Sequence, residues 1–319
     1  MHTVHVSLSS GGAYAVLHAA FWDRLDAVPS GQRFRRGITS MSGTSAGAVV
    51  GASVGLGVAG SNILHDLEAR GLDGRMHIVR ALLVYLKLKR SMYDGNAYLK
   101  RLTALCQNRK YPCIPMQVAV TSRLSMDQHC VKSISNAELL NAAVASASIP
   151  YVLQARDVQP YGKCMDGSVC NDSFARDCVK EHLNGSSGTV VLINCVPWPG
   201  FREEPVVRRG RSLARMLITN GIELYDHGME RLLGFNIVYQ DGIYDERYNN
   251  RSGAPVRDST GNLRVIFVAP TQSQYLRCGG AKTIGRLRYK RTDAHVRAMV
   301  ATGREMASEF LMRYGTLKL

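Results

Sequence analysis

The stretch Gly43-Thr44-Ser45-Ala46-Gly47 decides the fold of this chain. It has the form G-x-S-x-G, in which a serine stands on a tight turn between a strand and a helix. A bulky side chain two positions to either side of Ser45 would collide with the flanking strand or helix, so both glycines are expected for steric reasons. An apolar segment precedes the turn, and a run of small apolar residues that predicts a buried helix follows it. Ser45 would then lie at a helix N-terminus, where the helix dipole favours an oxyanion.

A second turn of small residues lies near the start of the chain. Residues 9–13 (S-S-G-G-A) follow a predicted strand and precede a segment with helical spacing over 14–26. The backbone N–H groups of Gly11, Gly12 and Ala13 can form a nest that holds a phosphate or an oxyanion. The dinucleotide pattern G-x-G-x-x-G is not met and no P-loop lysine follows. An oxyanion hole opposite Ser45 therefore explains this turn better than a nucleotide site.

Length and composition indicate a globular protein. A chain of 319 residues suits one large α/β domain or two small ones, and its 45% hydrophobic and 20% charged residues are ordinary. No apolar run approaches the ~20 residues of a membrane span, and the N-terminus lacks the features of a signal peptide. The eight cysteines include no C-x-x-C pair, which favours free thiols in a reducing compartment. We expect an intracellular protein, cytoplasmic or peripheral to a membrane.

The charge is unusual. A formal net charge of +15 favours an anionic partner such as phospholipid or nucleic acid, although an ordinary solvated surface is the alternative. Over residues 75–90, basic side chains flank an apolar run. This pattern is typical of a helix that lies on an anionic membrane or covers an apolar cleft, and equally of a core helix with a basic exposed end.

Strands and helices are predicted to alternate along the chain, which favours one mostly parallel sheet covered by helices on both faces. No internal repeat and no linker is found, and residues 241–262 are interpreted as a surface excursion. The predicted strands are 1–8, 115–121, 189–194 and 263–268. The predicted helices are 14–26, 46–54, 61–71, 97–106, 135–148, 212–233 and 292–314, with Ser61, Ser135 or Asn136, and Thr292 as caps.

Several of these segments together resemble the patatin-like phospholipases. That family has a glycine-rich turn after its first strand, an early G-x-S-x-G serine and a later D-G-G/A aspartate. The matching stretches here are 8–15 (L-S-S-G-G-A-Y-A), 43–47, 93–95 (Y-D-G), 145–150 (A-S-A-S-I-P) and 166–168 (D-G-S). The resemblance covers roughly residues 3–195, and the ordered set is far more specific than any one motif.

The resemblance implies a fold and a division of the chain. The fold is a three-layer α/β architecture, with a mostly parallel central sheet and helices on both faces. Residues 1–200 would form the catalytic core. Residues 201–319 would pack on the same domain, although their sequence matches no pattern that we recognise.

The resemblance also implies a chemistry. A serine hydroxyl is a poor nucleophile until a base takes its proton, and Asp166 would be the base that contacts Ser45 directly. Aspartate has a reference pKa of ~3.9, so burial must tune it for this role. The N–H groups of Gly11, Gly12 and Ala13 would stabilise the oxyanion, and Gly43, Gly47 and Gly167 would support the motifs. The expected substrate is a phospholipid or another lipid ester, with contact to an anionic membrane, no metal and no cofactor, and no nucleic acid.

Four positions depart from the family pattern. Ser10 and Ala15 stand where glycines are common, Tyr14 replaces a frequent arginine or lysine, and Ser168 replaces the small residue after D-G. The backbone donors survive these changes, so activity is expected, while rate and substrate preference depend on them.

Two other functions compete with this interpretation. A Ser-His-Asp hydrolase also uses G-x-S-x-G, and its base would be His182, His227 or His295; that fold normally has several strands before its serine. The other is a non-enzymatic protein with a degenerate patatin-like fold that binds an anionic membrane or nucleic acid. A basic stretch supports this alternative: Arg277, Lys282, Arg286, Arg288, Lys290 and Arg291. No nucleic-acid-binding signature accompanies the stretch, which counts against it.

Overall fold

The fold was examined in a computed structural model of the chain. The structure describes residues 3–70, 91, 93, 95–132, 135–150, 152–169, 188–195, 237–238, 256–258, 263–280 and 293–315. The membrane segment predicted over 75–90, the helix predicted over 212–233, His182 and His227 lie outside the described residues. Within the described ranges, no helix combines the length and the apolar character that crossing a membrane requires.

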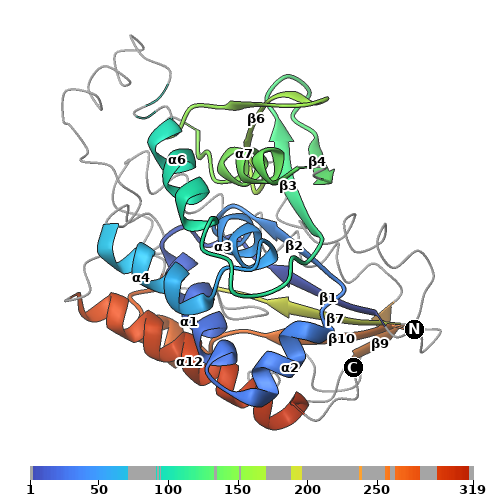
Figure 1. Cartoon of the computed structure of the whole chain (residues 1–319), viewed down its shortest axis with the longest axis vertical. Helices are drawn as coiled ribbons and strands as arrows, with labels where there is room; N and C mark the ends of the chain where they lie inside the picture. The colour runs from blue at the N-terminus through green and yellow to red at the C-terminus, as the bar shows by residue number, and fades with distance from the viewer. Residues whose placement is uncertain are drawn as a thin grey trace.

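A mixed, mostly parallel sheet forms the centre of the molecule (Figure 1). Its five central strands are parallel and run in the spatial order β3-β2-β1-β7-β10. Antiparallel strands extend both margins. The bounds are β1 Thr3–Leu8, β2 Ser40–Thr44, β3 Met116–Ser122, β4 Gln128–Lys132, β5 Arg156–Val158, β6 Gly162–Asp166, β7 Gly188–Ile193, β8 Ile237–Val238, β9 Val256–Asp258 and β10 Leu263–Val268.

Helices flank the sheet, as the sequence predicts. Their bounds are η1 Gly12–Tyr14, α1 Ala15–Asp26, α2 Pro29–Gly37, α3 Ala46–Gly55, α4 Gly60–Arg70, α6 Asn96–Leu105, α7 Asn136–Ser146, α10 Gln272–Arg277 and α12 Ala294–Tyr314. The capping box of α7 is present, because Ser135 accepts from the N–H of Glu138 and Glu138 reaches back. Two predicted caps are wrong: α4 begins at Gly60, so Ser61 lies inside that helix, and Asp293 rather than Thr292 caps α12.

The two faces of the sheet differ in chemistry because side chains alternate along a strand. Val4, Val6 and Leu8 of β1 belong to one apolar core cluster together with side chains of α1, α3 and α7. His5 faces the other way and contacts Ser40 Oγ at 2.7 Å and Ser42 Oγ at 2.9 Å, all of them buried. The α/β fold is therefore as predicted.

A buried ion pair holds the C-terminal end of α3. Arg35 of α2 donates to Asp26 at 2.6 Å and to the carbonyl oxygens of Val54 and Val58. Asp26 also accepts from the backbone N–H of Gly60 at 2.7 Å. Carbonyl oxygens at the C-terminal end of a helix have no hydrogen-bond donor within the helix. Arg35 therefore donates to buried carbonyl oxygens that would otherwise lack a partner. This anchor fixes the helix that begins beside Ser45.

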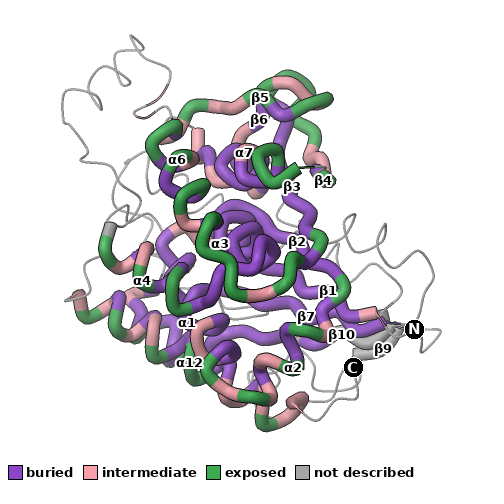
Figure 2. The backbone as a smooth tube through the Cα atoms, in the orientation of Figure 1, coloured by how far each residue is buried: buried purple, intermediate pink, exposed green. Residues whose placement is uncertain are grey.

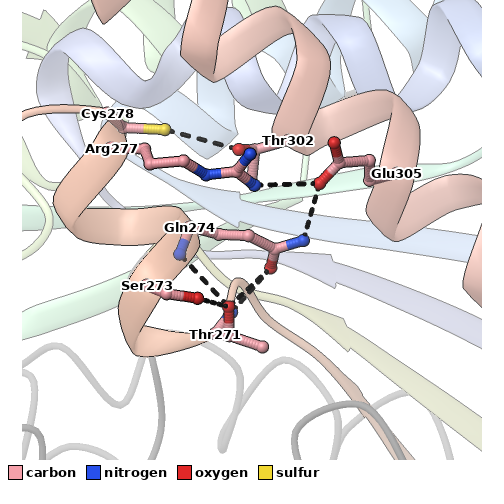
Figure 3. A network of polar contacts seen from close by, with 7 residues as sticks. All are labelled: Thr271, Ser273, Gln274, Arg277, Cys278, Thr302 and Glu305. Carbon is pink, nitrogen blue, oxygen red and sulfur yellow. Dashed lines mark hydrogen bonds and ion pairs between the residues drawn. The ribbon is translucent and has the colours of Figure 1, made fainter.

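The last helix packs against the first. In α12, Phe310 contacts Phe34 and Phe21 with ring centroids at 4.8 and 6.0 Å, and a Cβ on Gly303 would collide with the carbonyl oxygen of Leu17. Figure 3 shows how α10 is bound to α12. There Glu305 accepts from Gln274 at 2.9 Å and from Arg277 at 3.2 Å. The division of the chain near residue 200, into a catalytic core and a C-terminal part of the same domain, stays a prediction.

The cysteines differ in part from expectation. Five of them lie outside any disulfide, in agreement with the prediction of thiols: Cys106, Cys113, Cys164, Cys195 and Cys278. Cys130 in β4 is disulfide-bonded, so the prediction is wrong there. The absence of C-x-x-C pairs excluded only a close pairing in sequence, and cysteines far apart along the chain can still meet in the fold.

Candidate active site

Ser45 stands on the turn between β2 and α3 in a strained conformation. Its φ of 52° lies in the left-handed region, which residues other than glycine rarely adopt. The two motif glycines make this turn possible. A Cβ on Gly43 would lie 2.6 Å from the carbonyl oxygen of Gly47. A Cβ on Gly47 would collide with the carbonyl oxygen of Leu8 in β1. The spacing G-x-S-x-G is therefore needed for a close approach of backbone to backbone.

Asp166 ends β6 and is in direct contact with Ser45. The Ser45 hydroxyl donates to Asp166 Oδ2 at 2.7 Å across 121 residues of chain. The other carboxylate oxygen, Oδ1, accepts from the backbone N–H of Ser168 at 2.9 Å and from its hydroxyl at 2.7 Å. Both Ser45 and Asp166 are almost fully buried. Each carboxylate oxygen thus has its own donors, and Oδ2 is left directed at the serine.

Burial dominates the electrostatics of Asp166. Desolvation raises the pKa of its carboxyl, and the hydrogen bonds from Ser168 and Ser45 oppose that rise. A carboxylate that is costly to keep ionised holds a proton more readily. The position therefore has the physical property that a general base needs.

Ser146 of α7 supports both members of this pair. Its hydroxyl accepts from the backbone N–H of Ser45 at 2.8 Å and donates to the carbonyl oxygen of Ala119 in β3 at 2.6 Å. Its own carbonyl oxygen accepts from the N–H of Gly167 at 3.2 Å. Ser146 belongs to the A-S-A-S-I-P run at 145–150 and was not among the predicted site residues. That run is the signal that could have identified it.

The turn after β1 lies at the same edge of the sheet as Ser45, because β1 and β2 are parallel with Leu8 opposite Gly43. Gly12 has a φ of 51°, and the N–H of Tyr14 closes the turn on the carbonyl oxygen of Gly11 at 2.9 Å. Among the described residues, no acceptor is found for the backbone N–H groups of Gly11, Gly12 or Ala13. Three donors thus remain available at the N-terminal end of η1 and α1.

Residues from the end of β7 fix this turn from behind. Ser9 donates its N–H to the carbonyl oxygen of Ile193 at 3.0 Å and accepts from the N–H of Cys195 at 3.0 Å. His18 Nε2 lies 3.0 Å from the carbonyl oxygen of Ser9 and 2.9 Å from Cys195 Sγ. Burial lowers the pKa of His18 to about 4, so the ring is neutral at physiological pH. A Cβ on Gly11 would lie only 2.7 Å from Cys195 Sγ.

The four departures from the family pattern are accommodated. The Tyr14 ring is buried, stacks on Tyr275 at 5.4 Å and donates its hydroxyl to the carbonyl oxygen of Gly280 at 3.1 Å. Ala15 begins α1 and is buried, and the carbonyl oxygen of Ser10 accepts from the Ser9 hydroxyl at 3.0 Å. Ser168 differs from the other three, because its side chain contacts Asp166 itself.

Of the three competing histidine bases, only His295 lies within the described residues. His295 lies at the start of α12, where its Nδ1 is 3.5 Å from the carbonyl oxygen of Arg277. In the part of the chain that the structure describes, no cluster of ligands suited to a metal ion occurs, and Asp166 is the carboxylate that meets Ser45. The fold and this pair of side chains define the class: an α/β protein with a serine–carboxylate site.

The chain belongs to the patatin-like phospholipase family. The model of that family, described as patatin-like phospholipase, matches residues 6–179, which is more than half of the chain. The resemblance drawn from the motifs is thereby confirmed. The membership supports lipid ester hydrolysis as the general class of activity.

Solved structures show two distant likenesses. VipD from Legionella pneumophila superimposes with a TM-score of 0.42 at 12% identity, over 97% of this chain and 67% of that one. ExoU in its complex with SpcU, from the type III secretion system of Pseudomonas aeruginosa, gives 0.27 at 14% identity, over 73% of this chain and 52% of that one. No curated protein matches the chain in sequence. The family assignment therefore depends on the family model alone.

Proposed function

We propose that Ser45 and Asp166 form a catalytic dyad that cleaves fatty-acyl esters of phospholipid or another lipid through an acyl-enzyme. The observation that carries this proposal is the 2.7 Å hydrogen bond from the Ser45 hydroxyl to Asp166 Oδ2. Its support comes also from the strained turn, which presents the hydroxyl at the N-terminus of α3, and from the family membership.

In the first half of the reaction, Asp166 takes the proton of the Ser45 hydroxyl while the oxygen attacks the ester carbonyl. The developing oxyanion is stabilised by the backbone N–H groups of Gly11, Gly12 and Ala13. When the tetrahedral intermediate collapses, the carbonyl reforms and the alcohol leaves with the proton that Asp166 held. The fatty acyl group stays on Ser45 as an ester.

In the second half, water replaces the alcohol. Asp166 takes a proton from the water as its oxygen attacks the acyl ester, and the same N–H groups stabilise the oxyanion. Collapse breaks the bond to Ser45, which recovers the proton from Asp166, and the fatty acid is released. The raised pKa of Asp166 suits both transfers, because an aspartate at its ordinary pKa is a weak base at neutral pH.

The substrate is proposed to lie in an anionic membrane. The formal net charge of +15 would attract the protein to such a surface, and the basic and apolar residues over 75–90 would contribute contact there. The same charge supports the competing function, a non-enzymatic protein that binds an anionic membrane or nucleic acid.

One experiment separates these functions. The wild type, Ser45→Ala and Asp166→Asn are assayed on a short soluble ester and on anionic vesicles. We expect hydrolysis by the wild type and a loss of more than ~10⁴-fold in kcat for Ser45→Ala, as when nucleophiles are removed from other serine hydrolases. Equal turnover by wild type and Ser45→Ala would refute the dyad. Salt-dependent DNA binding without ester hydrolysis would establish the binding protein instead.

A further inference from the structure

The turn between β3 and β4, residues 123–127, presents two large apolar side chains to solvent. The Leu124 side chain is 97% exposed and that of Met126 is 46% exposed. Hydrogen bonds close the turn: the N–H of Ser122 donates to the carbonyl oxygen of Asp127 at 2.8 Å, and the N–H of Met126 donates to that of Ser122 at 2.9 Å. Figure 2 shows exposed chain at this end of the molecule. We call residues 123–127 the apolar tip.

The apolar tip lies beyond the edge of the sheet that carries the site. Strand β3 is parallel to β2, with Ala119 opposite Thr44, so both strands end at the same edge. Val120 is opposite Asp166, β3 ends two residues later at Ser122, and the apolar tip follows directly. The apolar tip therefore projects from the same edge as the serine and the aspartate.

The base of the apolar tip is bound to the turn that holds Asp166. Gln128 donates its side-chain amide to the carbonyl oxygen of Gly167 at 2.7 Å, and the Thr121 hydroxyl lies 3.3 Å from the same oxygen. The ring of His129 stacks on that of Tyr161, with centroids 4.3 Å apart, which supports β4 from the side. A surface that the apolar tip contacts would thus lie at a fixed position relative to Asp166.

The charges near the apolar tip balance. Arg123 and Asp127 are exposed within it, and Lys163 beside it pairs with Asp157 at 3.1 Å. The N–H of Arg123 donates to the carbonyl oxygen of Lys163 at 2.8 Å. Because the local charge is near zero, contact here would depend on Leu124 and Met126, while the net charge of the whole chain would act over longer range.

We propose that the apolar tip inserts into the surface of the lipid that carries the substrate and so orients the site toward it. This inference rests on the proposed function. A stable protein partner needs ~800 Å² of complementary surface on each side, which two side chains at the end of a hairpin cannot supply. A lipid surface requires no complementary shape, and it accepts single apolar side chains from an exposed turn.

The test compares two variants of matched chemistry. Leu124→Ser with Met126→Ser removes the apolar atoms of the tip without adding charge. Met312→Ser is the control, because Met312 on α12 is 77% exposed and belongs to another part of the surface. Binding to vesicles of phosphatidylcholine, alone and mixed with phosphatidylserine, is measured by sedimentation. Hydrolysis is measured on the same vesicles and on a short soluble ester.

We expect the tip variant to bind vesicles at least roughly tenfold more weakly, in low and in high salt. The free energy of moving one leucine side chain from water into an apolar phase corresponds to that factor in affinity or more. Hydrolysis of vesicle lipid should fall in proportion, while kcat/KM on the soluble ester should stay unchanged. Met312→Ser should behave as wild type. The thermal midpoints of all three proteins should agree, because the changed side chains are exposed.

Three results would overturn the proposal. The first is vesicle binding by the tip variant that equals that of the wild type. The second is a loss of vesicle binding in Met312→Ser as large as the loss in the tip variant. The third is a wild type that associates with itself in solution while the tip variant does not, which would assign the tip to a second copy of the chain. Failure of the proposed function looks different, since the wild type would then cleave no soluble ester whatever the vesicle binding shows.

Discussion

Replacement of Ser168 by alanine should move the pH dependence of the reaction toward alkaline pH. The change removes the hydroxyl that donates to Asp166 Oδ1 at 2.7 Å. It leaves the backbone N–H of residue 168 on Oδ1 and the Ser45 hydroxyl on Oδ2. The perturbation is therefore one hydrogen bond to an otherwise unchanged carboxylate.

The magnitude follows from the strength of that bond. A hydrogen bond to a charged group is worth ~1.5–3 kcal/mol, and one pKa unit corresponds to ~1.4 kcal/mol. The bond favours the ionised carboxylate, so its loss raises the pKa of Asp166, in the same direction as burial already does. A base must be ionised to act, so the acidic limb of kcat/KM should move upward by about one to two pH units.

The assay is the pH profile of kcat/KM on a short soluble ester. Well above the new pKa, Ser168→Ala should approach wild-type turnover, which is consistent with the small residue that the family usually has there. Ser168→Thr keeps a hydroxyl and serves as the control, with its acidic limb near that of the wild type. An unshifted limb in Ser168→Ala would refute the assignment of Asp166 as the base or of Ser168 as its partner.

Three further predictions concern stability, the oxyanion turn and the membrane. Asp166→Asn should abolish hydrolysis yet raise resistance to urea at neutral pH. Burial raises the pKa of Asp166 in the folded protein above 3.8, so the ionised carboxylate lowers the stability of the wild type at pH values above that raised pKa. The extra stability of Asp166→Asn should therefore disappear as the pH falls toward 3.8. Gly12→Val should lower turnover by ~10²–10³-fold or more, because φ is 51° there and the donors would be misdirected; near-normal rates in a folded variant would count against the oxyanion role. Changing Lys87, Lys89 and Arg90 to glutamine should weaken binding to anionic vesicles, by up to ~1 kcal/mol per residue at low salt, and spare soluble esters. Equal affinity would favour a core helix over 75–90.

The parts of the fold predicted from the sequence are those with local signals. The α/β fold with its mostly parallel sheet is confirmed, and four of its central strands, β1, β3, β7 and β10, coincide with apolar segments that the sequence predicts as strands. Helix α2 was missed because Pro29–Gly37 is polar, and its position depends on Phe34 against Phe310 and on Arg35 against Asp26. Such contacts join distant residues, and no local pattern contains them.

The same limit applies to the site. The motifs located Ser45 and Asp166, whose catalytic roles stay a proposal. Ser146 accepts from the backbone N–H of Ser45 across 101 residues of chain, and Gln128 in β4 donates to Gly167, which follows β6. An isolated serine or glutamine carries no sign of these partners in the sequence. Cys130 shows this again, because its disulfide depends on what the fold brings beside it.

The packing of α12 on α1 has a consequence for synthesis of the chain. Helix α1 ends at Asp26, and α12, which covers Phe21, begins at Ala294. At ~5–20 residues per second, a ribosome needs roughly a quarter of a minute to a minute to make the intervening ~270 residues. During that time the side of α1 that α12 will cover has no native partner. The apolar side of α1 is therefore expected to stay without its native cover until α12 has left the ribosome.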